Sequence, residues 1–227
     1  MITYPEHRPV VVATLLLMWC ALLLAYRVHL SYDSLPIWLA GNLLLAAIPL
    51  VCSTLLAVAA RKRRGIVAVA LFGLWLLFLP NAPYIITDLI HLTRPSPLPL
   101  WFNVALLASC AATGVVLGYL SLLDVHGVVD RRFGPRAGWT VAGGSLLLSG
   151  FGIYLGRFLR WNSWNLFTDP LRLAHGMLDA FTRPGGHPEP VPVTLVYGVG
   201  LVIGYVALRV LTAPGRSASI AQDTAQA

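Results

Sequence analysis

The sequence has few charged residues, and this shortage excludes a soluble globular protein. Asp, Glu, Lys and Arg make up only 11% of the 227 residues, whereas they account for about 25% of a soluble domain. Hydrophobic residues make up 57%, and the mean hydropathy is +0.74. We therefore predict an integral membrane protein whose principal partner is the lipid bilayer.

Cysteine is also scarce, which argues against a redox or metal centre built on thiols. Cys20, Cys52 and Cys110 fall in three different apolar segments, and none belongs to a CxxC motif. Small apolar side chains of this kind are typical of buried positions in helix bundles. The first apolar segment lacks a small-residue cleavage site, so we expect it to be retained as a helix.

Six apolar segments are long enough to cross a membrane, which requires about 20 helical residues. The predicted fold is an all-α transmembrane bundle of about six spans, with residues 1–212 forming one domain. Residues 213–227 are small and polar and are expected to form a disordered cytoplasmic tail. The spans are predicted near Val10–Tyr26, Leu35–Ala60, Gly65–Leu92 with a bend, Leu98–Leu123, Trp139–Phe158 and Val191–Leu211.

The basic residues gather in alternate connections, and this distribution predicts the orientation. The strongest cluster is Arg61–Arg64, and further arginines follow within Asp124–Gly138, which is expected to be a loop on the same side. Positively charged loops face the cytoplasm. Both termini are therefore expected to be cytoplasmic, in a multi-pass protein of the plasma membrane. Because topology accounts for the net charge of +7, nucleic acid is not an expected partner.

One stretch, Pro80–His91, combines polar residues with prolines at membrane depth. Asn81, Tyr84, Asp88 and His91 stand at i, i+3, i+7 and i+10, which is one stripe of a helix that continues after the prolines. Asn81 is also suited to capping that helix. Such a stripe must face protein or water rather than lipid.

Asp88 and His91 are the catalytic candidates in this stripe. A carboxylate and an imidazole one turn apart can exchange protons as a general acid and base, or can supply two ligands to a metal ion. A metal would need further ligands from Tyr84, Asp169 or His175. The sequence identifies neither a metal nor a cofactor.

A second polar segment, Gly156–Asn165, follows the fifth span and is expected on the same outer side. Arg157 and Arg160 are one turn apart, with Trp164 in line if the helix persists, and two guanidinium groups suit a phosphate or carboxylate. The two polar segments are predicted to meet. The ligand-binding candidates are Asn81, Tyr84, Arg157, Arg160, Asn162, Trp164 and Asp169.

Other polar residues have structural interpretations. Arg27 and His29 are expected to extend toward the interface at the end of the first span. Asp124 and His126 are expected to make helix-end contacts. A short amphipathic helix is predicted on the outer membrane surface. Its apolar side would consist of Leu171, Ala174, Leu178 and Phe181, and its polar side of Arg172, His175 and Asp179.

The strings LFLPNAPYIITDLIHL and GRFLRWNSWN resemble the signature segments of a family of small bacterial integral membrane proteins, domain of unknown function 1361. The resemblance extends from the second span to the sixth. It implies a bundle of about six helices and transfers no catalytic residue. It further implies an acidic residue where this chain has Asn103, so a metal site would have one ligand fewer here.

Three functions are compatible with these patterns. The first is an outer site that binds or acts on an anionic lipid or a lipid-linked phosphate. The second is an assembly subunit whose glycine-rich helices pack against a membrane-protein partner or a second copy. In that case the polar stripe would hold the helices of the chain together. The third, a transporter, is the weakest because the ionisable groups cluster at one end and no internal repeat is present.

Overall fold

The computed structural model describes residues 8–31, 34–93, 95–161, 163, 165–182 and 190–212, and within them every regular element is helical. Six helices have the length and hydropathy to cross a membrane, as predicted. The predicted tail, 213–227, lies outside the described residues. The elements are α1 (Arg8–Leu30), α2 (Leu35–Arg61), α3 (Gly65–Phe78), α4 (Asn81–Tyr84), η1 (Ile85–Thr93), α5 (Leu100–Phe133), α6 (Pro135–Arg157), α7 (Asn165–Thr168), α8 (Pro170–Thr182) and α9 (Pro190–Thr212).

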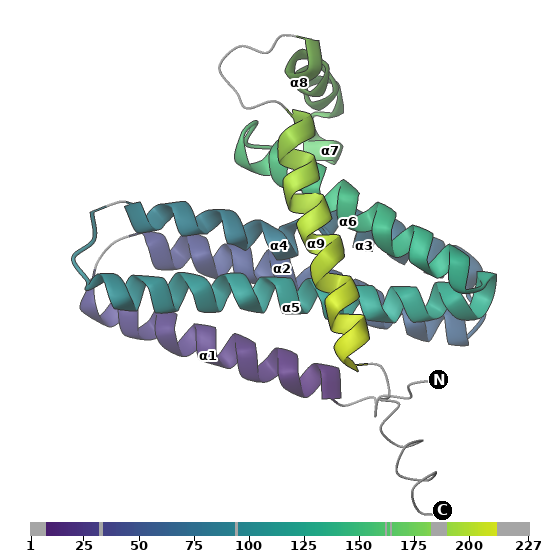
Figure 1. Ribbon diagram of the computed structural model, residues 1–227, viewed down its shortest axis with the longest axis horizontal. Coiled ribbons are helices and arrows are strands. Elements are labelled where there is room, and N and C mark those ends of the chain that lie inside the picture. The colour runs from purple at the N-terminus through teal and green to yellow at the C-terminus, as the bar shows by residue number, and fades with distance from the viewer. Residues whose placement is uncertain are drawn as a thin grey trace, which may run out of the picture.

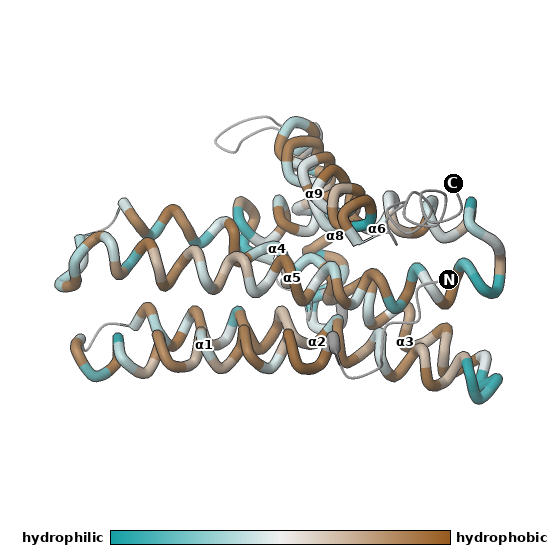
Figure 2. Tube along the Cα trace, turned by 60° about the horizontal axis from the view of Figure 1, so that its bottom comes forward, coloured by the Kyte–Doolittle hydropathy of each residue, from teal (hydrophilic) through white to brown (hydrophobic). Residues whose placement is uncertain are grey.

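The long helices alternate in direction, so their connections gather at two ends of the bundle. α1, α2 and α5 pack side by side, and α9 packs on α6 and crosses the other helices obliquely (Figure 1). We call the end with the α1–α2 and η1–α5 connections the cavity end. The opposite end, with the Arg61–Arg64 turn and the α5–α6 connection, is the basic end. Figure 2 shows long apolar stretches along α1, α2 and α3, and hydrophilic residues at the basic end.

The third span is bent at Pro80 and Pro83, as predicted, because proline cannot donate to the helical ladder. It comprises α3, the short α4 and the 3₁₀ helix η1. The predicted continuation as an α-helix is thus wrong. A 3₁₀ helix rises about 2 Å per residue instead of 1.5 Å, so the nine residues of η1 cover about 18 Å. This extension carries the span toward the cavity end.

Asn81 does not cap the helix after the bend, which corrects the prediction. Its Nδ2 donates to the Phe78 carbonyl at 3.1 Å and to the Ser163 hydroxyl at 2.9 Å. The Ser163 hydroxyl in turn donates to the Leu77 carbonyl at 3.1 Å. Asn81 therefore pairs the backbone that the prolines disturb and ties the segment after α6 to the bend.

α5 continues ten residues beyond the predicted end of the fourth span, so the expected loop from Asp124 begins only at Gly134. The polar side chains in this extension find partners inside the protein. Asp124 accepts a hydrogen bond from the Ser53 hydroxyl at 3.0 Å, and Nδ1 of His126, which is fully buried, lies 2.8 Å from the Tyr205 hydroxyl. Asp124 and His126 therefore connect α5 to α2 and α9, and neither lies at a helix end as predicted.

Glycines bring the spans close together, as the small-residue spacings predicted. A Cβ atom at Gly114 of α5 would overlap the Ala82 carbonyl oxygen in α4. A Cβ atom at Gly150 of α6 would lie 2.7 Å from the backbone nitrogen of Gly198 in α9. These glycine faces are thus occupied by contacts within the chain.

Candidate functional site

A cavity of about 810 Å³ lies toward the cavity end, between α2, the bent third span, α5, α6 and α8. Both of its long walls are built from spanning helices, so it lies within the membrane-spanning part of the fold. Its polar lining residues are Arg27, Ser34, Asn42, Asn81, Tyr84, Asp88, His91, Ser96, Asn103, Arg157 and Ser163.

The polar stripe of the third span lies along one wall of this cavity. Asn81, Tyr84, Asp88 and His91 all line it, although two of them come from α4 and two from η1. Within η1 the 3₁₀ helix keeps Asp88 and His91 on one side, because residues three apart are eclipsed when there are three residues per turn. Asp88 and His91 are therefore in line on the cavity side.

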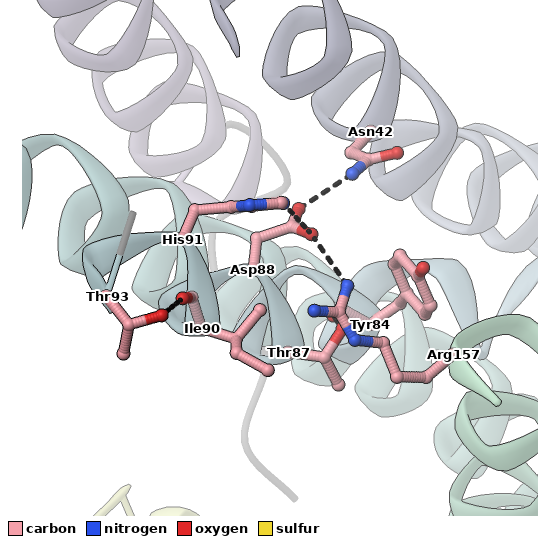
Figure 3. Close-up of polar contacts among 8 residues, drawn as sticks. All are labelled: Asn42, Tyr84, Thr87, Asp88, Ile90, His91, Thr93 and Arg157. Carbon is pink, nitrogen blue, oxygen red and sulfur yellow. Dashed lines mark hydrogen bonds and ion pairs between the residues drawn. The ribbon is translucent and has the colours of Figure 1, made fainter. Parts of the chain in front are cut away.

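Asp88 is the point where three elements meet. Asn42 of α2 donates its Nδ2 to Oδ2 of Asp88 at 2.7 Å. Nη1 of Arg157, at the end of α6, lies 3.7 Å from Oδ1 of Asp88, and Nε2 of His91 lies 3.9 Å from the same oxygen. Figure 3 shows these side chains converging on the carboxylate. Asp88 is only 4% exposed, so its charge is held by these neighbours rather than by water.

The predicted meeting of the two polar segments therefore occurs at two places, between Arg157 and Asp88 and between Ser163 and Asn81. Two other ligand-binding candidates, Arg160 and Asp169, lie elsewhere. Arg160 is exposed and does not line the cavity, and Asp169 Oδ1 accepts a hydrogen bond from the Arg172 backbone at 3.2 Å, which caps α8. Asn162 and Trp164 are outside the described residues.

Arg160 is separated from Arg157 by the end of α6. The Trp161 backbone nitrogen donates to the Leu155 carbonyl at 3.1 Å, and Arg160 has a left-handed backbone with φ of 57°. α6 ends at Arg157 with Phe158 as its C-cap, so the left-handed Arg160 lies beyond the helix. The helical spacing that was expected to align Arg157 with Arg160 is thus interrupted between them.

Arg27 is a second cation of the cavity, and its side chain does not extend toward the interface as predicted. The residue lies in the last turn of α1, which ends at Leu30. The side chain is 2% exposed and lines the cavity, and its guanidinium donates to Oδ1 of Asn103 in α5. Asn103 in turn donates to the Leu98 carbonyl at 3.1 Å. The sequence offered no signal for this pairing, because the two residues lie on different spans.

α8 covers part of the cavity. Leu173 and Met177 line the cavity, whereas Leu171 and Leu178, two members of the predicted apolar side, are 74% and 61% exposed. α8 therefore has an inner side against the site and an exposed apolar side. The predicted helix exists, and the exposed apolar side is the one expected on the membrane surface, whereas the contact of its other side with the cavity was not predicted.

A metal site has little support in the side chains around Asp88 and His91. Within the described part of the chain, no three His, Cys, Asp or Glu residues are grouped closely enough to hold a metal ion. His175 is exposed on α8, and the Asp169 carboxylate is engaged as the cap of that helix. Of the proposed third ligands, Tyr84 alone lines the cavity.

The charges of the described lining residues favour an anionic ligand. Arg27 and Arg157 contribute two positive charges, and Asp88 contributes the one carboxylate among these residues. A guanidinium away from bulk water needs an oxyanion or several acceptors, and it grips phosphate or carboxylate oxygens in a planar fork. The arrangement thus suits a phosphate or carboxylate group.

The six spans and this internal polar cavity define a multi-pass helical membrane protein. The chain belongs to the family described as Protein of unknown function (DUF1361), whose sequence profile matches residues 41–204. The matched region contains the whole bent span and the end of α6, so Asp88, His91 and Arg157 are all within it. Neither the comparison with curated proteins nor that with solved structures found a match.

Proposed function

We propose that the cavity binds an anionic lipid head group or a lipid-linked phosphate at the extracytoplasmic side of the membrane. The observation that carries this proposal is the presence of two guanidinium groups, those of Arg27 and Arg157, in the wall of one cavity inside the spanning bundle. The described lining holds these two guanidinium groups and one carboxylate, that of Asp88. A guanidinium group binds phosphate or carboxylate oxygens in a planar fork, so the site suits an anionic group.

The basic end supports the assignment of sides. Arg61–Arg64 and the arginines beside Gly134 lie there, opposite the α1–α2 and η1–α5 connections. Basic loops remain in the cytoplasm. The cavity end then faces outward, and both termini are cytoplasmic in the plasma membrane. The ligand would reach the site from the outer leaflet.

Asp88 and His91 are positioned for proton exchange with such a ligand. His91 is 19% exposed, and its Nε2 lies 3.9 Å from the carboxylate that Arg157 also contacts. A phosphate held at Arg157 would lie beside the imidazole, which can donate a proton to a leaving oxygen or accept one from an attacking hydroxyl. In this proposal Asp88 positions His91 and balances its charge.

An assembly subunit is the second candidate, but its main argument is weakened. Some of the glycines that favoured a partner surface are used within the chain, with Gly114 against α4 and Gly150 against α9, whereas Gly143, Gly144 and Gly200 have open space around them. The polar stripe also borders a cavity instead of a closed helix interface. These two observations favour the ligand-binding proposal.

A lipid-binding assay with two matched variants tests the proposal. The protein is titrated in detergent micelles with fluorescent phosphatidylglycerol and, separately, with fluorescent phosphatidylcholine. We expect Arg157→Gln to weaken phosphatidylglycerol binding by about tenfold or more, since a charged hydrogen bond contributes roughly 1.5–3 kcal/mol. Arg160→Gln, three residues away and outside the cavity, should bind as the parent does. Equal binding of both lipids, or equal loss in both variants, contradicts the proposal.

A further inference from the structure

The cavity wall changes from polar to apolar along α6. Arg157 contributes a guanidinium where the helix ends, and the lining residues before it in sequence include Phe151 and Leu148. Leu148 and Arg157 are nine positions apart in the sequence, which corresponds to about 14 Å along the helix axis. That length is about half of a hydrocarbon core of 30 Å.

The same gradient occurs on α5, where the lining passes from Asn103 to Leu107 with increasing distance from the cavity end. On α2, Leu45 lies beyond Asn42, while Leu35 and Trp38 line the cavity nearer its end. Leu45, Leu107, Leu148 and Phe151 thus form an apolar compartment farther in than Asn42, Asn103 and Arg157. A water-soluble anion would fill the polar half and leave the apolar half without a partner.

The cavity also reaches the outer surface of the bundle on α2 and α6, at Trp38 near the cavity end and at Leu148 farther in. Trp38 of α2 and Leu148 of α6 both line the cavity, and yet they are 70% and 55% exposed. In a spanning helix, exposed side chains of this kind face lipid. α2 packs closely on α1, α3, α4 and α5, and α6 on α4, α5 and α9, so these two helices flank the opening without closing it.

We propose that the apolar half of the cavity holds the hydrocarbon chain of the ligand, which enters sideways from the bilayer between α2 and α6. This inference rests on the proposed function and narrows the ligand class to long-chain amphiphiles with an anionic head group. Phospholipids and isoprenoid phosphates share this chemistry, and so does a long-chain fatty acid. Soluble phosphate compounds are excluded as ligands.

Photolabelling tests the position of the chain. Phosphatidylglycerol with a diazirine near the end of one acyl chain is incorporated into phosphatidylcholine nanodiscs with the protein, irradiated, and mapped by peptide mass spectrometry. We expect labelled peptides that contain Leu45 or Phe151. Long-chain phosphatidylglycerol, farnesyl phosphate and palmitate serve as competitors and distinguish the sources of the chain. Glycerol phosphate and dibutyryl phosphatidylglycerol should compete at least about tenfold less well, because they lack buried methylene groups.

Two adjacent residues provide a matched pair of variants. Leu45→Trp places extra volume in the apolar compartment, whereas Leu44→Trp places the same side chain at a position that is 73% exposed. We expect Leu45→Trp to reduce labelling about tenfold, the equivalent of losing roughly two buried methylene contacts. Leu44→Trp should label as the parent does. Leu148→Trp, at an exposed position that tolerates a larger side chain, should slow labelling even if Leu45→Trp fails to fold.

The outcomes separate this inference from the proposed function. If dibutyryl phosphatidylglycerol competes as well as the long-chain lipid and the tryptophan variants label normally, the chain compartment is overturned. Binding that still depends on Arg157 would then leave the anion site intact. If Arg157→Gln also changes nothing, both proposals fail.

Discussion

Asp88 in η1 and Arg157 at the end of α6 lie on different spans, and their Oδ1 and Nη1 atoms are 3.7 Å apart. This contact joins the bent third span to the fifth span at the cavity wall (Figure 3). It also means that the carboxylate competes with any anionic ligand for the same guanidinium.

Asp88→Asn should tighten the binding of an anionic lipid. The amide oxygen can still accept the hydrogen bond from Asn42, so the local structure is retained while the competing charge is removed. We expect the dissociation constant of fluorescent phosphatidylglycerol to fall by up to about tenfold. Weaker binding in this variant would contradict the account, because it would mean that the carboxylate attracts the ligand.

Arg27→Gln should weaken anion binding and lower the melting temperature of the protein in detergent. The guanidinium is buried and donates to Asn103, so its removal takes away a charge from the cavity and a link between α1 and α5. We expect about a tenfold loss of phosphatidylglycerol affinity. His29→Gln, at an exposed position two residues away, is the control and should change neither quantity.

Gly114→Ala should destabilise the bundle by about 1–3 kcal/mol, the usual cost of forcing extra volume into a packed contact. Its methyl group would overlap the backbone of Ala82 and press on Ile85. Gly73→Ala, on α3, has open space around the added atom and should be neutral or slightly stabilising. Thermal unfolding of the two variants in the same detergent measures the difference. Similar unfolding curves would show that α4 does not pack on α5 in this way.

The orientation predicts opposite results for reporters at the two ends. Green fluorescent protein fused after Thr212 should fluoresce, because that end of α9 is assigned to the cytoplasm. Alkaline phosphatase fused after Ser96 should be active, because it would be exported. An inactive phosphatase there together with an active fusion after Gly134 would reverse the sides and place the cavity toward the cytoplasm.

The fold and half of the site follow from simple periodicities. Segment lengths and hydropathy predict the six spans, and the spacing of Asn81, Tyr84, Asp88 and His91 predicts a shared wall. That stripe was recoverable because the eclipsed residues of a 3₁₀ helix and the turns of an α-helix both place residues three apart on one side.

The missed features depend on where helices end and on contacts between spans. Arg27 was assigned to an interface because it stands at the end of the first span, whereas its side chain packs inward against Asn103. Arg160 was aligned with Arg157 on the condition that the helix persists, whereas α6 ends at Arg157 and Arg160 has a left-handed backbone. The sequence around Asn42 does not indicate its partner, because its hydrogen bond to Asp88 joins two different helices, α2 and η1.

Native mass spectrometry of the freshly purified protein tests the central claim most directly, with elemental analysis of phosphorus and metals on the same sample. Parent, Arg157→Gln and Arg160→Gln proteins are prepared in parallel without added lipid. The account predicts a bound anionic lipid or lipid-linked phosphate on the parent and on Arg160→Gln, with loss of that mass from Arg157→Gln. A parent that carries no such mass, or equal occupancy in all three proteins, would contradict an anion site at Arg157.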